Sequence, residues 1–346
     1  MGTGASGAEN LGTSVALSAD GNIALIGGVG AALVFTRSSG GWSQQGNALV
    51  PSDATGPAYF GGSVALSSDG STALIGGRGD NNDFGTAWVF AYSGGVWSQQ
   101  GSKLIGSGAT GLIVAQGSSV ALSADGSTAL VGGQGDNYGI GAAWVFTRSG
   151  ATWTQQGGKL VGSGASGGLV SQGYSVALSS DGNTGLIGGP NDNSFAGAVW
   201  VFTRSSAVWS QLGNKLVGSG ASRSLMFVYQ GRSVALSGDG GTALVGGVGD
   251  NNDIGAVWAF TLTNGVWSQQ GNKLIGSGYS GQPQEGSSVA LSSDGNIALF
   301  GSPADNYQQG AAWTFTRSGA FGPSKAVSWS GAAIPGPWAI RPRYPR

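Results

Sequence analysis

The sequence of 346 residues contains no cysteine and no histidine, and its only glutamates are Glu9 and Glu285. Without cysteine, the fold uses neither disulfide bonds nor thiolate metal ligands. Without histidine, the commonest general base is missing, and so are the Ser-His-Asp triad and imidazole metal sites. These absences exclude most of the familiar catalytic centres.

Charge and long apolar runs are also scarce. The chain has 15 basic and 16 acidic residues, whereas nucleic-acid binding needs a dense basic surface. No apolar run approaches the roughly 18 residues of a membrane-spanning helix. We therefore expect neither nucleic acid as a partner nor a membrane span. The Gly/Ser-rich, cysteine-free composition favours an extracellular or cell-surface protein whose signal peptide has been removed and replaced by Met1. A chain that never carried a signal peptide is the alternative.

What the sequence does contain is a repeat. The pentapeptide S-V-A-L-S recurs six times, 49 to 58 residues apart, starting at Ser14, Ser63, Ser119, Ser175, Ser233 and Ser288. Each copy holds four short apolar runs separated by turn signals, which in the third copy are 120–122, 128–131, 142–147 and 153–160. Short strands joined by Asp-Gly and Ser-Gly turns predict a four-stranded antiparallel blade.

The predicted fold is therefore all-β, a single β-propeller of six blades over residues 1–331, followed by a Pro/Arg-rich tail over 332–346. Seven blades and a β-solenoid are the alternatives. Alternation along the third strand places Trp144 and Phe146 on one face, and we expect such tryptophans to pack between blades. The tryptophans of the fourth strands are expected nearer the rim, where they are half exposed.

The repeat pattern S-V-A-L-S-x-D-G, followed by G-A-A-W-V-F-T-R-S-G and W-x-Q-Q-x-x-K-L, resembles that of bacterial FG-GAP repeat proteins. The resemblance extends over about residues 11–320, and the Phe-Gly pair itself occurs at Phe60-Gly61. These proteins are relatives of the integrin α-subunit head, a seven-bladed β-propeller. The resemblance implies the same architecture for this chain.

Polar loops between the second and third strands form the candidate ligand-binding surface. In a blade these loops share a face with the connectors, and carboxylates, amides and tyrosines there would suit sugar hydroxyls. The candidate residues are Asp80, Asn81, Asp83, Asp136, Asn137, Tyr138, Asp192, Asn193, Asp250, Asn251, Asp253, Asp305, Asn306 and Tyr307. The alternative is that these residues only form Asx-turns that stabilise the hairpins.

We expect no cofactor. The turn aspartates such as Asp125 recur before glycine in every copy, but each turn offers one acid, whereas calcium takes six to eight oxygen ligands. Calcium is accordingly a possible stabiliser and not an expected one. A glycosidase needs only two carboxylates, but repetition argues against a unique pair. The chain is therefore predicted not to be an enzyme.

The sequence favours a non-catalytic recognition or adhesion module that binds a surface glycan or another surface polymer. The alternative is a structural protein that assembles into a filament, matrix or surface layer through its outer strands, as a homo-oligomer. The tail adds a separate prediction, because Trp338, Ile340 and Tyr344 are apolar groups among prolines and arginines. We expect them to dock either on the chain's own propeller, as a clasp, or on a neighbouring subunit.

Overall fold

The computed structural model describes residues 9–222, 227–318 and 328–333. These residues form six four-stranded antiparallel sheets, each with its strands in chain order. Blades one to three are β1 (Glu9–Leu17), β2 (Ile23–Val29), β3 (Ala31–Ser38), β4 (Gly41–Gln44); β5 (Phe60–Leu66), β6 (Thr72–Gly77), β7 (Thr86–Ser93), β8 (Val96–Gln99); and β9 (Gln116–Leu122), β10 (Thr128–Gly133), β11 (Ala142–Ser149), β12 (Thr152–Gln155).

Blades four to six repeat the same order. They are β13 (Ser175–Leu178), β14 (Thr184–Gly189), β15 (Ala198–Ser205), β16 (Val208–Gln211); β17 (Ser233–Leu236), β18 (Thr242–Gly247), β19 (Ala256–Thr263), β20 (Val266–Gln269); and β21 (Ser288–Leu291), β22 (Ile297–Ser302), β23 (Ala311–Ser318), β24 (Ser328–Ala333).

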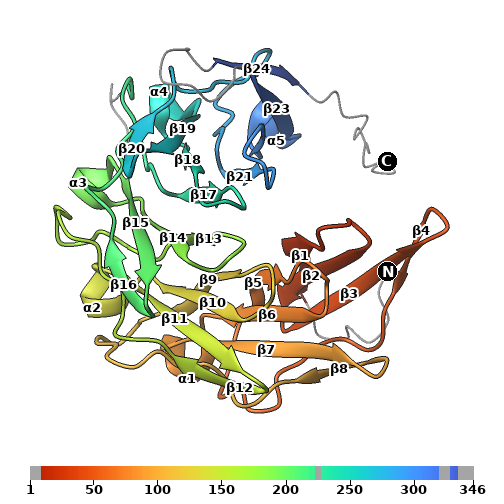
Figure 1. Cartoon of the computed structure of the whole chain (residues 1–346). Coiled ribbons are helices and arrows are strands. Elements are labelled where there is room, and N and C mark those ends of the chain that lie inside the picture. Colours follow the sequence, from red (N-terminus) through yellow and green to blue (C-terminus); the bar gives the residue numbers. More distant parts are fainter. Residues whose placement is uncertain (1–8, 223–226, 319–327, 334–346) are drawn as a thin grey trace, which may run out of the picture.

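The six sheets lie around a common centre, with the first strand of each blade innermost and the fourth outermost (Figure 1). This confirms the predicted six-bladed, all-β propeller. The described residues contain no seventh blade. In Figure 1 the ring is open between the first blade, β1–β4, and the sixth, β21–β24.

Each innermost hairpin is closed by the aspartate that precedes the turn glycine. In the third blade, Ser123 Oγ donates to Asp125 Oδ1 over 2.6 Å, and the Ser127 N–H donates to the same oxygen over 2.9 Å. Gly126 follows with φ +66°, a left-handed backbone that glycine adopts without a steric penalty. The aspartate thus satisfies turn groups, as the sequence predicted.

The hairpin turns are linked from blade to blade by backbone hydrogen bonds. Each turn donates to the carbonyl of the next turn over 2.8–2.9 Å, in the series Ala19 to Ser68, Ser68 to Ala124, Ala124 to Ser180, Ser180 to Gly238 and Gly238 to Ser293. Among the described residues, no bond links Ser293 back to Ala19. The series therefore couples five blade junctions and leaves the sixth open.

Packing between adjacent blades forms the core. Val131 pairs with Trp144, and Ala129 with Phe146, so the tryptophan and the phenylalanine share one face, as predicted. This face packs against Leu74 and Val89 of the preceding blade. Removing an indole from water stabilises the fold by about 4–6 kcal/mol, taking ~150–250 Å² at ~25 cal/mol per Å². The interior tryptophans Trp88, Trp144, Trp200, Trp258 and Trp313 are all buried.

The fourth strands are shorter than the sequence suggested. The run 153–160 was expected to be one strand, but β12 ends at Gln155 and only Leu160 bridges back, to Ala143. Gly157 interrupts the run with φ +75°. Trp153 is half-buried at the rim, and its Nε1 donates to Gln100 Oε1 of the preceding blade over 2.9 Å.

Candidate functional site

Five blades carry a single helical turn between their second and third strands. These turns are α1 (Asp80–Asp83), α2 (Asp136–Gly139), α3 (Asp192–Phe195), α4 (Asp250–Asp253) and α5 (Asp305–Gln308). Their second and third residues are left-handed; in α2, Asn137 has φ 49° and Tyr138 φ 57°. Asparagine tolerates this region better than most residues, which explains the recurrent Asp-Asn pair. Blade one lacks the turn because Gly30, at φ +98°, leads directly into β3.

The first aspartate of each turn points into the protein. In blade three, Asp136 is fully buried, its Oδ2 lies 2.6 Å from Lys159 Nζ, and its Oδ1 accepts the Thr110 N–H over 2.8 Å. The same pairing recurs in blades two, four and five, as Asp80–Lys103, Asp192–Lys215 and Asp250–Lys273. Both oxygens of each carboxylate are therefore engaged, and they tie the turn to the lysine that follows the fourth strand and to the connector.

The structure divides the predicted ligand-binding set. Its first aspartates lie inside the protein, whereas the amides and rings that follow them face solvent, with Tyr138 76% and Tyr307 92% exposed. The other solvent-facing members are Asn81, Asp83, Asn137, Asn193 and Asn306, and the partly exposed ones are Asn251 and Asp253. A ligand role for the exposed members stays a prediction.

Blade six differs from the others at Asp305. Its Oδ1 accepts the Ser280 N–H over 2.7 Å, as in the other turns. Within the described part of the chain, however, no lysine pairs with it, and its side chain makes no other hydrogen bond. Asp305 is 8% exposed and lies next to the exposed Asn306 and Tyr307. Asp305 is thus a carboxylate without a described counter-ion. It lies on the face that carries the turns α1 to α5, called the loop face below.

A second carboxyl group, Glu285, is close enough to interact with the charge of Asp305. In the three preceding connectors this position is a buried glutamine that holds a glycine by two hydrogen bonds, here called the glycine clamp. Gln230 Oε1 accepts the Gly218 N–H over 2.6 Å, and Gln230 Nε2 donates to the Gly218 carbonyl over 3.0 Å. Gln116 and Gln172 make the same pair of bonds.

Glu285 can make only half of this clamp when it is ionised. Its Oε2 accepts the Gly276 N–H over 2.7 Å, and its Oε1 is buried with no hydrogen-bond partner in the part of the chain that the structure describes. Burial, together with the negative charge of Asp305, raises the pKa of Glu285 from 4.5 to about 7, against the opposing effect of the Gly276 hydrogen bond. A protonated Glu285 has the donor that the clamp requires.

The sequence analysis found neither the Asp–Lys pairs nor the glycine clamp in which Glu285 replaces glutamine, although the sequence contains evidence of both. The lysine follows its aspartate by a constant 23 residues in four blades, as in Asp136 and Lys159, and Glu285 replaces glutamine at a repeated position. Aligning the six copies by their charged residues would have shown both.

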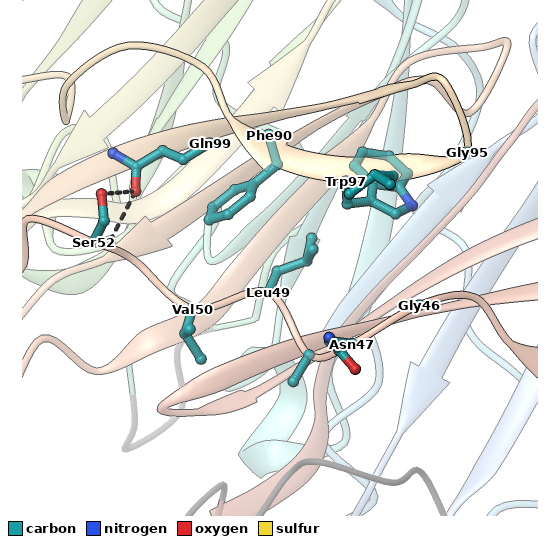
Figure 2. Close-up of a pocket in the computed structure, with 11 residues that line it drawn as sticks. Gly46, Asn47, Leu49, Val50, Ser52, Phe90, Gly95, Trp97 and Gln99 are labelled. Carbon is teal, nitrogen blue, oxygen red and sulfur yellow. Dashed lines mark hydrogen bonds between the residues drawn. The ribbon is translucent and has the colours of Figure 1, made fainter.

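Two grooves at the outer rim are the other hollows of note. The first, of about 420 Å³, lies between the connector of blade one and β8 and is lined by Leu49, Phe90 and Trp97 (Figure 2). Ser52 closes one end, where its N–H and Oγ both donate to Gln99 Oε1. A second groove, of about 520 Å³, lies at the corresponding place beside β12. Neither groove is lined by a carboxyl group.

The match to known families agrees with this geometry. A model of the FG-GAP repeat matches residues 42–90, the segment that runs from β4 to β7. The chain is an FG-GAP-type β-propeller. No curated protein matches this propeller closely enough to be compared. A solved structure, the periplasmic gluconolactonase PpgL of Pseudomonas aeruginosa, matches it with a TM-score of 0.54 and 16% identity, over 94% of this chain and 89% of the other.

This likeness corrects the functional prediction. At 16% identity it shows the fold alone, but the protein with that fold is an enzyme. The prediction that the chain is not an enzyme is therefore contradicted, because a propeller of similar shape is an enzyme. The prediction of a recognition or adhesion module is contradicted as well, and so is its alternative, a structural protein that assembles. The Asp–Lys pairs give the physical reason, because the repeated aspartates serve the fold.

Three further predictions were made on membranes, metals and the tail. No helix in the described ranges has the length and apolar character needed to cross a membrane. Within the same ranges no three acidic residues gather as metal ligands. The docking prediction for Trp338, Ile340 and Tyr344 lies outside the described residues.

Proposed function

We propose that this propeller is a hydrolase of cyclic esters whose substrates are lactones of sugar acids. The observation that carries the proposal is Asp305, the buried loop-face carboxylate without a described lysine partner. The likeness in fold to a gluconolactonase supports the substrate class. In the other four turns a lysine pairs with the second oxygen of the first aspartate.

Asp305 acts as the general base. The Ser280 N–H fixes its Oδ1, and Oδ2, which has no partner among the described residues, takes a proton from a water molecule. The water oxygen forms a bond to the lactone carbonyl carbon, and the resulting tetrahedral intermediate collapses with cleavage of the ring C–O bond. The proton held by Asp305 passes to the departing ring oxygen. One water is consumed, a hydroxy acid is released, and the carboxylate is regenerated.

The residues around Asp305 suit a small polyhydroxylated ring. Asn306 and Tyr307 follow it in α5, and both face solvent. An amide donates to and accepts from hydroxyl groups, and a tyrosine ring offers an apolar face for stacking. We assign these two residues to substrate binding and Asp305 to catalysis.

The test is proton release from glucono-δ-lactone by the purified chain, followed with a pH indicator against the buffer rate. Asp305→Asn keeps the Ser280 hydrogen bond but accepts protons poorly, and should lower kcat/KM by about 100-fold or more. Asp83→Asn is the matched control, since it removes an exposed carboxylate from the same loop face of blade two. A wild-type rate equal to buffer, or full activity in Asp305→Asn, contradicts the proposal.

We also propose an extracellular or periplasmic site of action. The absence of cysteine and the periplasmic origin of the matched gluconolactonase support it. Fractionation of cells that express the native gene, with marker enzymes for each compartment, tests the location. Recovery in the cytoplasmic fraction alone would contradict it.

A further inference from the structure

The first and sixth blades expose apolar residues whose equivalents are buried at the closed blade junctions. On the sixth blade, Leu299 is 38% exposed, whereas its equivalent in each of the other five blades is fully buried. On the first blade, Val15 is 68% exposed. At the junction of blades two and three the equivalent residues, Leu74 and Val120, pack in one cluster. The two exposed surfaces lie on either side of the open junction in Figure 1, and exposed apolar surface of this kind marks an interaction site.

The sixth blade also has an unfilled socket beside Gly301. The socket measures about 410 Å³, and Ser288 and Pro303 are among the residues that line it. At the closed junctions this place receives an X-Gly segment from the next blade, so that a Cβ built on Gly246 would lie 2.2 Å from the Gly286 carbonyl oxygen. Among the described residues, only the Ser288 side chain lies within 4 Å of the Cβ position of Gly301.

The first blade carries the matching segment, Leu11-Gly12, already in the docked conformation. In the five docked segments the residue before the X-Gly pair has φ between 49° and 61°, and the glycine has φ between +79° and +90°. Asn10 has φ 54° and Gly12 has φ +96°. A left-handed residue other than glycine is strained, and at the closed junctions docking compensates for the strain. The first blade thus holds a preformed docking segment whose glycine has no described atom within 4 Å of its Cβ position.

The closed junctions also hold the α-turns in place. At the junction of blades five and six, the Glu285 N–H donates to the Ile254 carbonyl at the end of α4 over 2.8 Å. In the sixth blade the equivalent acceptor is the Gln309 carbonyl at the end of α5, and the equivalent donor is the Leu11 N–H. No bond joins these two groups within the described residues. The turn that carries Asp305 therefore lacks the anchor that the turns of blades two to five have.

We propose that the ring closes reversibly between the first and sixth blades, by docking of Leu11-Gly12 against Gly301, and that closure anchors α5. The form in Figure 1 is the open state, and the closed state repeats the contacts of the other five junctions. Burial of Val15 against Leu299 favours the closed state. Closure is independent of the lactonase proposal, because both measurements below are made without a substrate.

A pair of introduced cysteines can trap the closed state, since the chain has none of its own. Neighbouring turns are adjacent at a closed junction: the Gly238 N–H donates to the Ser293 carbonyl over 2.8 Å, and a Cβ on Gly238 would lie 2.3 Å from Ser293 Oγ. Ala19→Cys with Ser293→Cys should therefore form a disulfide within one chain when the ring closes. Ser68→Cys with Ala124→Cys, at a closed junction, is the positive control. Non-reducing electrophoresis after mild oxidation follows both pairs.

Glycine variants show whether the disulfide depends on docking. Gly301→Val fills the socket and should slow disulfide formation in the Ala19→Cys, Ser293→Cys chain at least tenfold. Gly12→Val removes the left-handed glycine from the docking segment and should act in the same way. Gly158→Val, at an exposed glycine with open space around it, should leave the rate unchanged. Normal disulfide formation by the Ser68→Cys, Ala124→Cys pair in each variant verifies that the chain still folds.

Hydrogen exchange tests the consequence for α5. Amides of residues 305–310 should exchange at least tenfold more slowly in the oxidised chain than in the reduced one, whereas those of residues 136–141, beside a junction that is already closed, should not change. Equal exchange of residues 305–310 in both forms overturns the anchoring of α5. No disulfide where the positive control forms one, or a rate that Gly301→Val leaves unchanged, overturns the closure. So does a disulfide that joins two chains, because the docking segment would then come from a second copy.

Discussion

Replacement of Glu285 by glutamine should change the pH dependence of stability in a defined window. Below pH 4.5 the carboxyl group is protonated in both the folded and the unfolded chain. Between pH 4.5 and about 7 the folded chain retains the proton and the unfolded chain does not, so stability falls as pH rises. Above about pH 7 the loss is complete. The Glu285→Gln protein should not show this loss of stability.

The magnitude follows from the shift in pKa. A rise from 4.5 to about 7, at ~1.36 kcal/mol per unit, gives a maximal loss of about 3 kcal/mol. Relaxation of the connector around Gly276 lowers this figure, so about 2–3 kcal/mol is expected. Glu285→Gln should therefore exceed the wild type by that amount at pH 8. At pH 4 the two proteins should be nearly equal.

Urea unfolding at half-unit steps from pH 4 to pH 8.5 measures this difference. The structure supplies a reciprocal variant, because Gln230 makes the complete clamp in blade five. Gln230→Glu should acquire the loss that Glu285→Gln removes. A constant difference between Glu285→Gln and wild type across the pH range would refute the reasoning, since it would mean that no proton is bound at this position.

Two further predictions concern the repeated contacts. Lys159→Ala leaves Asp136 buried without its counter-ion and should lower the free energy of unfolding, measured with urea, by about 3 kcal/mol. Adding Asp136→Asn in the same chain should restore part of this loss. No recovery in the double variant would show that the aliphatic part of the lysine matters and its charge does not. Gly132→Val should destabilise by about 2–3 kcal/mol, because its Cβ would meet the Gly173 carbonyl. A Gly132→Val protein as stable as the wild type would contradict this contact.

Much of the fold could be predicted because each blade repeats a local pattern. The alternation around Trp144 sets the buried face, and the Ser-x-Asp-Gly turn sets the hairpin, both within a few residues. The end of the fourth strand was misjudged because the apolar residue Leu160 pairs with Ala143 beyond a glycine turn. Local pattern alone could not distinguish a continuous strand from a bridge.

The candidate site was harder to predict because it depends on contacts between copies. Asp136 and Asp305 occupy equivalent positions, yet the first is paired with lysine and the second has no described counter-ion. An interpretation based only on what the copies share treats both aspartates as turn residues. Likewise, Glu285 differs from Gln230 by a single atom type, and the consequence appears only once the glycine clamp is seen.

Within a repeat protein, each blade serves as a control for the others. Positions that are alike in most blades, such as the tryptophans buried in five of the six, show what the fold requires. Where one blade has a different residue and its neighbours keep the repeated one, the fold alone does not explain the difference. Asp305 and Glu285 both belong to the sixth blade and its connector, so the two departures lie close to the proposed chemistry. The Asp305→Asn and Glu285→Gln variants separate their roles, because the first should lower turnover and the second should change the pH dependence of stability.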